Sequence, residues 1–174
     1  MSLRGGIPVT RGRAIVLAFT LATSGAYAQD MASPTLAGGV ADLERCLADT
    51  PDNPHSCAGR LANRCQEAPD GGTTIGIVAC LSQESDLWDQ LLNARYEATV
   101  RATREEADEI GPDGPDAVAS LRDAQRKWIG YRDAECGRLH DRWSGGTIRS
   151  IVYASCVLQQ TAARAIDLAP DAEL

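Results

Sequence analysis

The hydrophobic positions of the central part of the chain repeat with the period of an α-helix. One apolar stripe begins near residue 79 and comprises Leu81, Trp88, Leu92, Tyr96 and Val100. Because this spacing places all five side chains on one helical face, it predicts a long helix that ends near residue 109. The glycine- and proline-rich run at residues 111–116 breaks the pattern and predicts a turn.

Two further helices are predicted after this turn. Pro115 suits the first turn of the next helix, which we expect to end near His140. Its inward stripe is Val118, Leu121, Gln125, Trp128, Arg132, Cys136 and Leu139. Residues 143–147 form the next turn, with Thr147 as a candidate N-cap. A third helix with a continuous apolar face then runs to Ala169-Pro170.

Two short helices are predicted upstream, at residues 41–48 and 56–67, with a proline-containing break between them. Residues 74–78 fit either a short strand or the start of the long helix. The expected fold class is therefore all-α: a small, disulfide-stapled helical bundle of three main helices plus an N-terminal helical pair.

The first 28 residues have the pattern of a secretory signal peptide. Three arginines precede an apolar stretch at residues 14–22, which is too short to span a bilayer, and Ala26-Tyr27-Ala28 forms an A-x-A cleavage site. We therefore expect cleavage near Ala28 and a periplasmic or secreted protein. The remaining chain is divided into a flexible leader at 29–38, a cysteine-containing helical extension at 39–75 and a main helical domain at 76–170.

All six cysteines follow the predicted cleavage site, in a compartment where disulfides persist. Proximity along the chain favours the pairs Cys46–Cys57, Cys65–Cys80 and Cys136–Cys156. Other pairings that use Cys80 stay open, since six cysteines allow about 15 connectivities. The sequence has no C-x-x-C motif, and its two histidines fit no zinc spacing, so we expect neither a metal nor another cofactor.

The net charge of the chain limits the kinds of partner that the protein is expected to bind. Residues 29–174 hold 14 basic and 24 acidic side chains, a net charge of −10. This balance argues against binding to nucleic acid or to anionic lipid, because both require basic surfaces. The negative charge favours a basic protein partner, or it serves only to keep the protein surface soluble.

Several polar residues fall on or near the predicted buried faces. If the first two long helices are antiparallel about residue 112, Asp89 lies level with residue 135, Asn93 with residue 131, and Tyr96 with Trp128. Arg132 on an apolar stripe needs a partner, and Asp89 and Asn93 are within reach. Such a network either fixes the helix register or forms a recognition site. The candidate binding residues are Asp89, Asn93, Gln125, Trp128, Arg132 and Asp133.

The order of these residues resembles a known family. Cys80 precedes Asp89-x-x-Leu92-Asn93-x-x-Tyr96, and Leu121-x-x-Ala124-Gln125-x-x-Trp128-x-x-x-Arg132-Asp133-x-x-Cys136 follows, and then come Gly145-Gly146, Tyr153-x-x-Cys156 and Thr161-x-x-Arg164. The pattern is similar to the lysozyme inhibitor LprI-like N-terminal domain over about residues 76–168. The resemblance implies an exported helical domain and, for some members, lysozyme inhibition. It supplies no inhibitory motif, and the upstream cysteines depart from the simplest members.

Three functional hypotheses follow. The first is a lysozyme (muramidase) inhibitor of the bacterial envelope, with the loops at 68–74, 111–116 and 141–147 as candidate inhibitory elements. Asp113 and Asp116 make the second loop attractive for a basic enzyme, although a turn also explains them. The second hypothesis is a periplasmic structural or assembly protein. The third is an enzyme acting on cell-wall glycan, which would need two carboxylates facing a cleft at roughly 5–10 Å. Catalysis in general is disfavoured because the sequence has no Ser/His/Asp, Cys/His or H-E-x-x-H arrangement.

Overall fold

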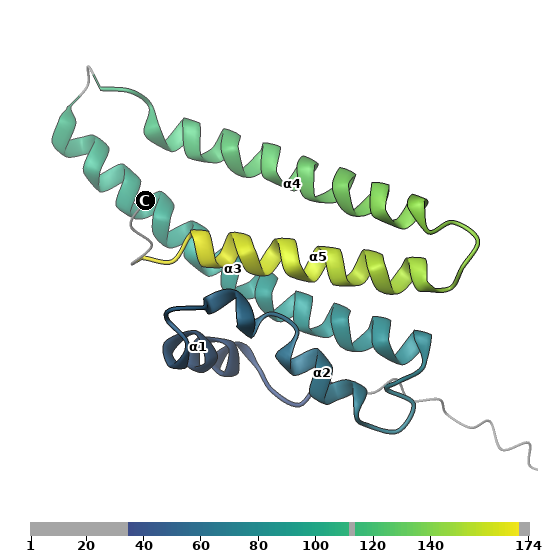
Figure 1. Ribbon diagram of the computed structural model, residues 1–174. Helices are drawn as coiled ribbons and strands as arrows, with labels where there is room; N and C mark the ends of the chain where they lie inside the picture. The colour runs from purple at the N-terminus through teal and green to yellow at the C-terminus, as the bar shows by residue number, and fades with distance from the viewer. Residues whose placement is uncertain (1–34, 112–113, 171–174) are drawn as a thin grey trace, which may run out of the picture. The chain divides into compact units, whose positions relative to one another are not determined.

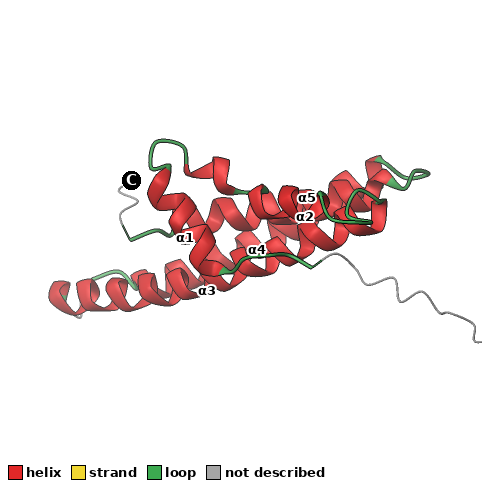
Figure 2. Cartoon of the chain, turned by 90° about the horizontal axis from the view of Figure 1, so that it is seen from below, coloured by secondary structure: helices red, strands yellow, loops and turns green. Residues whose placement is uncertain are grey.

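The computed structural model describes residues 35–111 and 114–170. The predicted signal peptide, part of the predicted leader and Asp113 lie outside these ranges. The described chain forms α1 (Val40–Asp49), a 3₁₀ turn η1 (Pro54–Cys57), α2 (Arg60–Gln66), α3 (Thr74–Ile110), α4 (Ala117–Arg142) and α5 (Ile148–Asp167). The described part contains no strand (Figure 2), which confirms the all-α class, and residues 74–78 form the first turns of α3.

Helix α5 lies between α3 and α4 along much of its length (Figure 1). Its inward face consists of small and medium side chains, including Ala154, Leu158 and Ala162, all of them buried. The facing stripe of α3 buries Trp88 and Leu92, as its period predicted. Because α5 occupies the space between them, α3 and α4 do not form the continuous antiparallel pair assumed from the sequence.

The N-terminal helices pack against α3 and bury Leu43, Leu61 and Ala62 in the same core. Three disulfides fasten the elements: Cys46–Cys57 joins α1 to η1, Cys65–Cys80 joins α2 to α3, and Cys136–Cys156 joins α4 to α5. These are the three pairs that proximity along the chain favours. The described residues contain no free cysteine.

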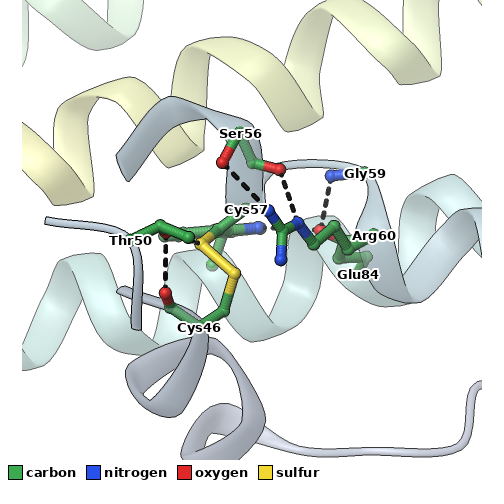
Figure 3. Close-up of a disulfide and its surroundings, with 8 residues drawn as sticks. Cys46, Thr50, Ser56, Cys57, Gly59, Arg60 and Glu84 are labelled. Carbon is green, nitrogen blue, oxygen red and sulfur yellow. Dashed lines mark hydrogen bonds between the residues drawn. A yellow bond between two sulfur atoms is a disulfide. The ribbon is translucent and has the colours of Figure 1, made fainter. Parts of the chain in front are cut away.

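Glu84 is fully buried in α3 and organises the contact between α3 and α2. Its carboxylate accepts hydrogen bonds from the backbone N–H of Gly59 at 2.7 Å and of Ala62 at 2.6 Å (Figure 3 shows the first). Gly59 is the N-cap of α2, has no capping side chain, and adopts a left-handed φ of 92° that favours glycine. Glu84 therefore satisfies two N–H groups that the first turn of α2 would otherwise leave unpaired.

Other helix ends are satisfied more locally. Asp116 caps α4 by accepting a 2.8 Å hydrogen bond from the Ala119 N–H. Thr147 occupies the N-cap position of α5 as predicted, but its side chain accepts no capping hydrogen bond. At the other end of α5, Arg95 donates a 2.7 Å hydrogen bond to the carbonyl of Ala165, where a cation also complements the helix dipole. Burial lowers the pKa of the Arg95 guanidinium.

Candidate binding groove

The six predicted binding residues do not form one network. Asp89 and Asn93 bond to each other on the exposed surface of α3, with Asn93 donating a 2.9 Å hydrogen bond. Arg132 pairs with Asp133 at 2.8 Å, so the expected contact of Arg132 with Asp89 or Asn93 is wrong. The physical reason is the position of α5, which separates the middle of α3 from α4.

The remaining predicted residues contribute in two ways. The Arg132 guanidinium lies over the Trp128 ring, 5.2 Å from its centroid. This contact and the pair with Asp133 satisfy the charge of a largely buried Arg132 side chain, which is only 19% exposed. Gln125 is buried and accepts a 3.0 Å hydrogen bond from Arg164 Nε, so it connects α4 to α5. The sequence pattern placed Gln125 correctly on the inward face but did not indicate Arg164 as its partner.

Arg132 and Asp133 line a groove of about 600 Å³, and this groove is the candidate functional site. Residues of α5 lie along the groove together with residues from the first half of α3 and the second half of α4. Its charged and aromatic lining residues are Asp86, Arg132, Asp133, His140 and Tyr153. Asp89, Asn93, Gln125 and Trp128 do not line it.

The lining of the groove is partly polar and partly apolar. Serine hydroxyls come from Ser82 and Ser85 on α3 and from Ser150 on α5, while Val78, Ala154 and Val157 supply apolar surface. Tyr153 is 41% exposed, and its ring contacts His140 edge-on at a centroid distance of 6.0 Å. Asp86 and the serines carry no distinctive signal in the sequence, because isolated polar residues on a helix are typical of any solvated face.

The three candidate inhibitory loops differ in what they expose. In the loop at 68–74, the Thr73 hydroxyl accepts a hydrogen bond from the Gly76 N–H. In the loop at 111–116, the carboxylate of Asp116 caps α4, and Asp113 lies outside the described residues. The turn at 141–147 presents the large exposed side chain of Trp143, with exposed Ile148 directly after it.

The last turns of α3 form a second notable surface, which we call the acidic end. It consists of Glu105, Glu106, Asp108 and Glu109, all of them exposed. No basic residue lies in the last turn of α3, and none of these four carboxylates enters an ion pair with another described residue. Negative charge at a helix C-terminus is unfavourable because it meets the negative end of the helix dipole, so the helix dipole does not favour Asp108 and Glu109 in the last turn.

Comparison with known proteins decides the family. Residues 65–168 match the family described as "Lysozyme inhibitor LprI". This chain belongs to the LprI family. It is also 30% identical over 118 residues to "Uncharacterized protein R02472" of Rhizobium meliloti (strain 1021), an alignment that covers 64% of this chain and 85% of the relative. No solved structure matches this chain.

The LprI match covers all of α3, α4 and α5, and therefore both the groove and the acidic end. It begins at Cys65 and leaves out α1, η1 and the Cys46–Cys57 disulfide. Within the described residues, no helix is long and apolar enough to cross a membrane. Nor does any group of three His, Cys, Asp or Glu side chains in residues 35–111 and 114–170 have an arrangement suited to a metal ion.

Proposed function

We propose that this LprI family member is an exported binding protein, not an enzyme, and that it inhibits a lysozyme or related muramidase. The observation that carries the proposal is the family match, which spans the three helices that build the bundle. The periplasmic or secreted location rests on the signal-like pattern of residues 1–28 and on the three disulfides. Mass spectrometry of exported protein should then find Gln29 as the first residue.

The acidic end is the surface that best fits a basic lysozyme. Four exposed carboxylates without ion-pair partners in the described structure project from two successive turns of α3. Animal lysozymes are basic, and complementary charge accelerates association and fixes orientation. The loop at 111–116 directly follows the acidic end, so charge steering would bring that loop close to the enzyme.

A lysozyme lysis assay tests this proposal. Purified mature protein should suppress lysis, and the suppression should weaken with added salt because exposed charges are screened. A variant with Glu105→Gln, Glu106→Gln, Asp108→Asn and Glu109→Gln should inhibit less well. The matched control neutralises four other exposed carboxylates that form no ion pair among the described residues: Asp49→Asn, Asp52→Asn, Glu67→Gln and Asp70→Asn.

Both variants change the net charge by the same amount, so a difference between them assigns the effect to the acidic end. Unchanged lysis at excess wild-type protein would reject inhibition of the lysozyme tested.

The alternative function, a periplasmic structural or assembly protein, is favoured by the exposed apolar side chains of Trp143 and Ile148, which are both 46% exposed. This alternative would be supported if the wild-type protein captures an envelope protein, the Trp143→Ser variant does not capture it, and the wild-type protein has no effect on lysis.

A further inference from the structure

We propose that the groove between α3, α4 and α5 binds a short, uncharged oligosaccharide, an activity separate from lysozyme inhibition. Its volume of about 600 Å³ lies within the range of roughly 300–1,000 Å³ that small-molecule sites occupy. Three helices contribute to its lining, and the Cys136–Cys156 disulfide fixes two of them relative to each other. The groove is therefore a largely pre-formed site.

The charges that line the groove disfavour an anionic ligand. Arg132 is the one Lys or Arg among the described residues that line the groove, and it is already paired with Asp133 at 2.8 Å. Asp86 forms no ion pair within the described chain. A phosphate or carboxylate would face two carboxylates with no free guanidinium to offset them.

Unused hydroxyl groups give the strongest indication of the ligand. Ser82, Ser85, Ser150 and Tyr153 line the groove, and none of their hydroxyls hydrogen-bonds to another described residue. A serine within a helix often bonds back to the carbonyl four residues earlier, and these do not. Each hydroxyl both donates and accepts, and Asp86 adds an acceptor. A sugar hydroxyl also donates and accepts, so a saccharide matches this set better than a ligand that only donates or only accepts.

The apolar part of the lining suits the same ligand. The half-exposed Tyr153 ring is positioned by its edge-on contact with His140, and Val78, Ala154 and Val157 extend the apolar surface beside it. A pyranose ring has an apolar C–H face that packs on aromatic and aliphatic surface, while its hydroxyls point outward. The groove thus offers apolar surface for the ring face and polar groups for the rim.

Gly137 lines the groove on the α4 side, where the absence of a side chain leaves space in the groove. A Cβ added at this position would meet nothing within 4 Å, so packing inside the protein does not require glycine there. A larger side chain at position 137 would project into the groove. Gly130 lies in the same helix, and a Cβ added there would also meet no atom within 4 Å, but Gly130 does not line the groove. The two glycines therefore form a matched pair for an experiment.

The test is titration of the mature, oxidised protein with chitotriose and with maltotriose, followed by NMR chemical shifts or calorimetry. We expect saturable binding of at least one trisaccharide, with shifts at groove residues. Gly137→Leu should weaken that binding at least about tenfold, and Gly130→Leu should leave it within about twofold. Tyr153→Ala and Asp86→Asn should each weaken it, whereas Tyr131→Ala, at an exposed tyrosine outside the groove, should not.

The proposal is overturned if neither trisaccharide binds saturably, or if Gly137→Leu and Gly130→Leu behave alike. Lysis assays on the same variants separate the two functions. If Gly137→Leu abolishes lysozyme inhibition while no saccharide binds, the groove receives part of a protein partner instead, and the oligosaccharide proposal is wrong. If saccharide binds and no variant or wild-type protein affects lysis, the oligosaccharide proposal holds and the inhibitor proposal fails for that lysozyme.

Discussion

The indole Nε1 of Trp88 donates a 3.0 Å hydrogen bond to the carboxylate of Glu84, one turn earlier in α3, and both side chains are fully buried. The same carboxylate accepts the N–H groups of Gly59 and Ala62 at the start of α2. One acidic side chain therefore connects the largest buried aromatic side chain to the N-terminal helices. Its negative charge is compensated by hydrogen bonds, since no basic side chain pairs with it within the described residues.

We expect Glu84→Gln to lower the free energy of unfolding by about 2–3 kcal/mol, because hydrogen bonds to a charged group are strong and an amide would turn a donor toward N–H groups. Denaturant unfolding of the oxidised protein, followed by tryptophan fluorescence, measures this change. Glu97→Gln, at an exposed position of the same helix, should change stability by less than about 0.5 kcal/mol. Equal stability of the two variants would contradict the role assigned to Glu84.

Removal of the Cys136–Cys156 disulfide should loosen α4 more than any other element. Only Gln125 and Cys136 of α4 are buried, so the helix has few other strong attachments. The double variant Cys136→Ala, Cys156→Ala should lose about 2–4 kcal/mol of stability. Hydrogen exchange should show lost protection in α4, while α2 and the first half of α3 keep theirs. Uniform loss of protection across all helices would contradict this assignment.

The hydrogen bond from Arg164 to Gln125 should contribute measurably to the α4–α5 contact. Gln125→Ala removes the acceptor and leaves the half-buried Arg164 Nε without its 3.0 Å partner. We expect a loss of about 1–2 kcal/mol. A double-mutant cycle with Arg164→Met isolates the pair, and its coupling energy should be at least about 0.5 kcal/mol. Additive effects of the two substitutions would show that the hydrogen bond is not responsible.

Neutralising the acidic end should stabilise the protein even as it weakens the proposed inhibition. Each carboxylate removed from the last turn of α3 should add roughly 0.3–1 kcal/mol at low ionic strength, because it relieves repulsion with the helix dipole. Thermal unfolding of Glu109→Gln at low and high salt tests this, and the gain should shrink in salt. A loss of stability would mean that Glu109 has a favourable interaction, and the acidic end would then need a structural explanation.

Periodicity was sufficient to predict most of the secondary structure. The stripe from Leu81 to Val100 marked α3, and the inward positions of α4 include its two buried residues, Gln125 and Cys136. The turns were marked by glycine and proline, and the expected helix ends differ from the observed ones by a few residues. Residues 74–78 were ambiguous because a short run of apolar and small residues fits either period, and their continuity with α3 decides the matter.

The sequence does not predict which helices pack side by side. A simple hairpin would place α3 beside α4, and nothing in the pattern of either helix shows that α5 lies between them. The predicted contact of Arg132 with Asp89 or Asn93 is wrong for that reason, and the sequence does not predict the groove along α5. Glu84 did carry a signal, since an acidic residue sits between Leu81 and Trp88 on an apolar stripe, yet its partners on α2 are visible only in three dimensions.

The cap that Glu84 provides for α2 makes the two regions of the chain interdependent. Gly59 and Ala62 precede the family-matched residues 65–168, whereas Glu84 lies within them. A shortened protein beginning at Cys65 would leave a carboxylate on an apolar surface newly opened to water, where Leu43 and Leu61 had covered the core. Trimming this chain to its family-defining segment should therefore yield an aggregation-prone fragment.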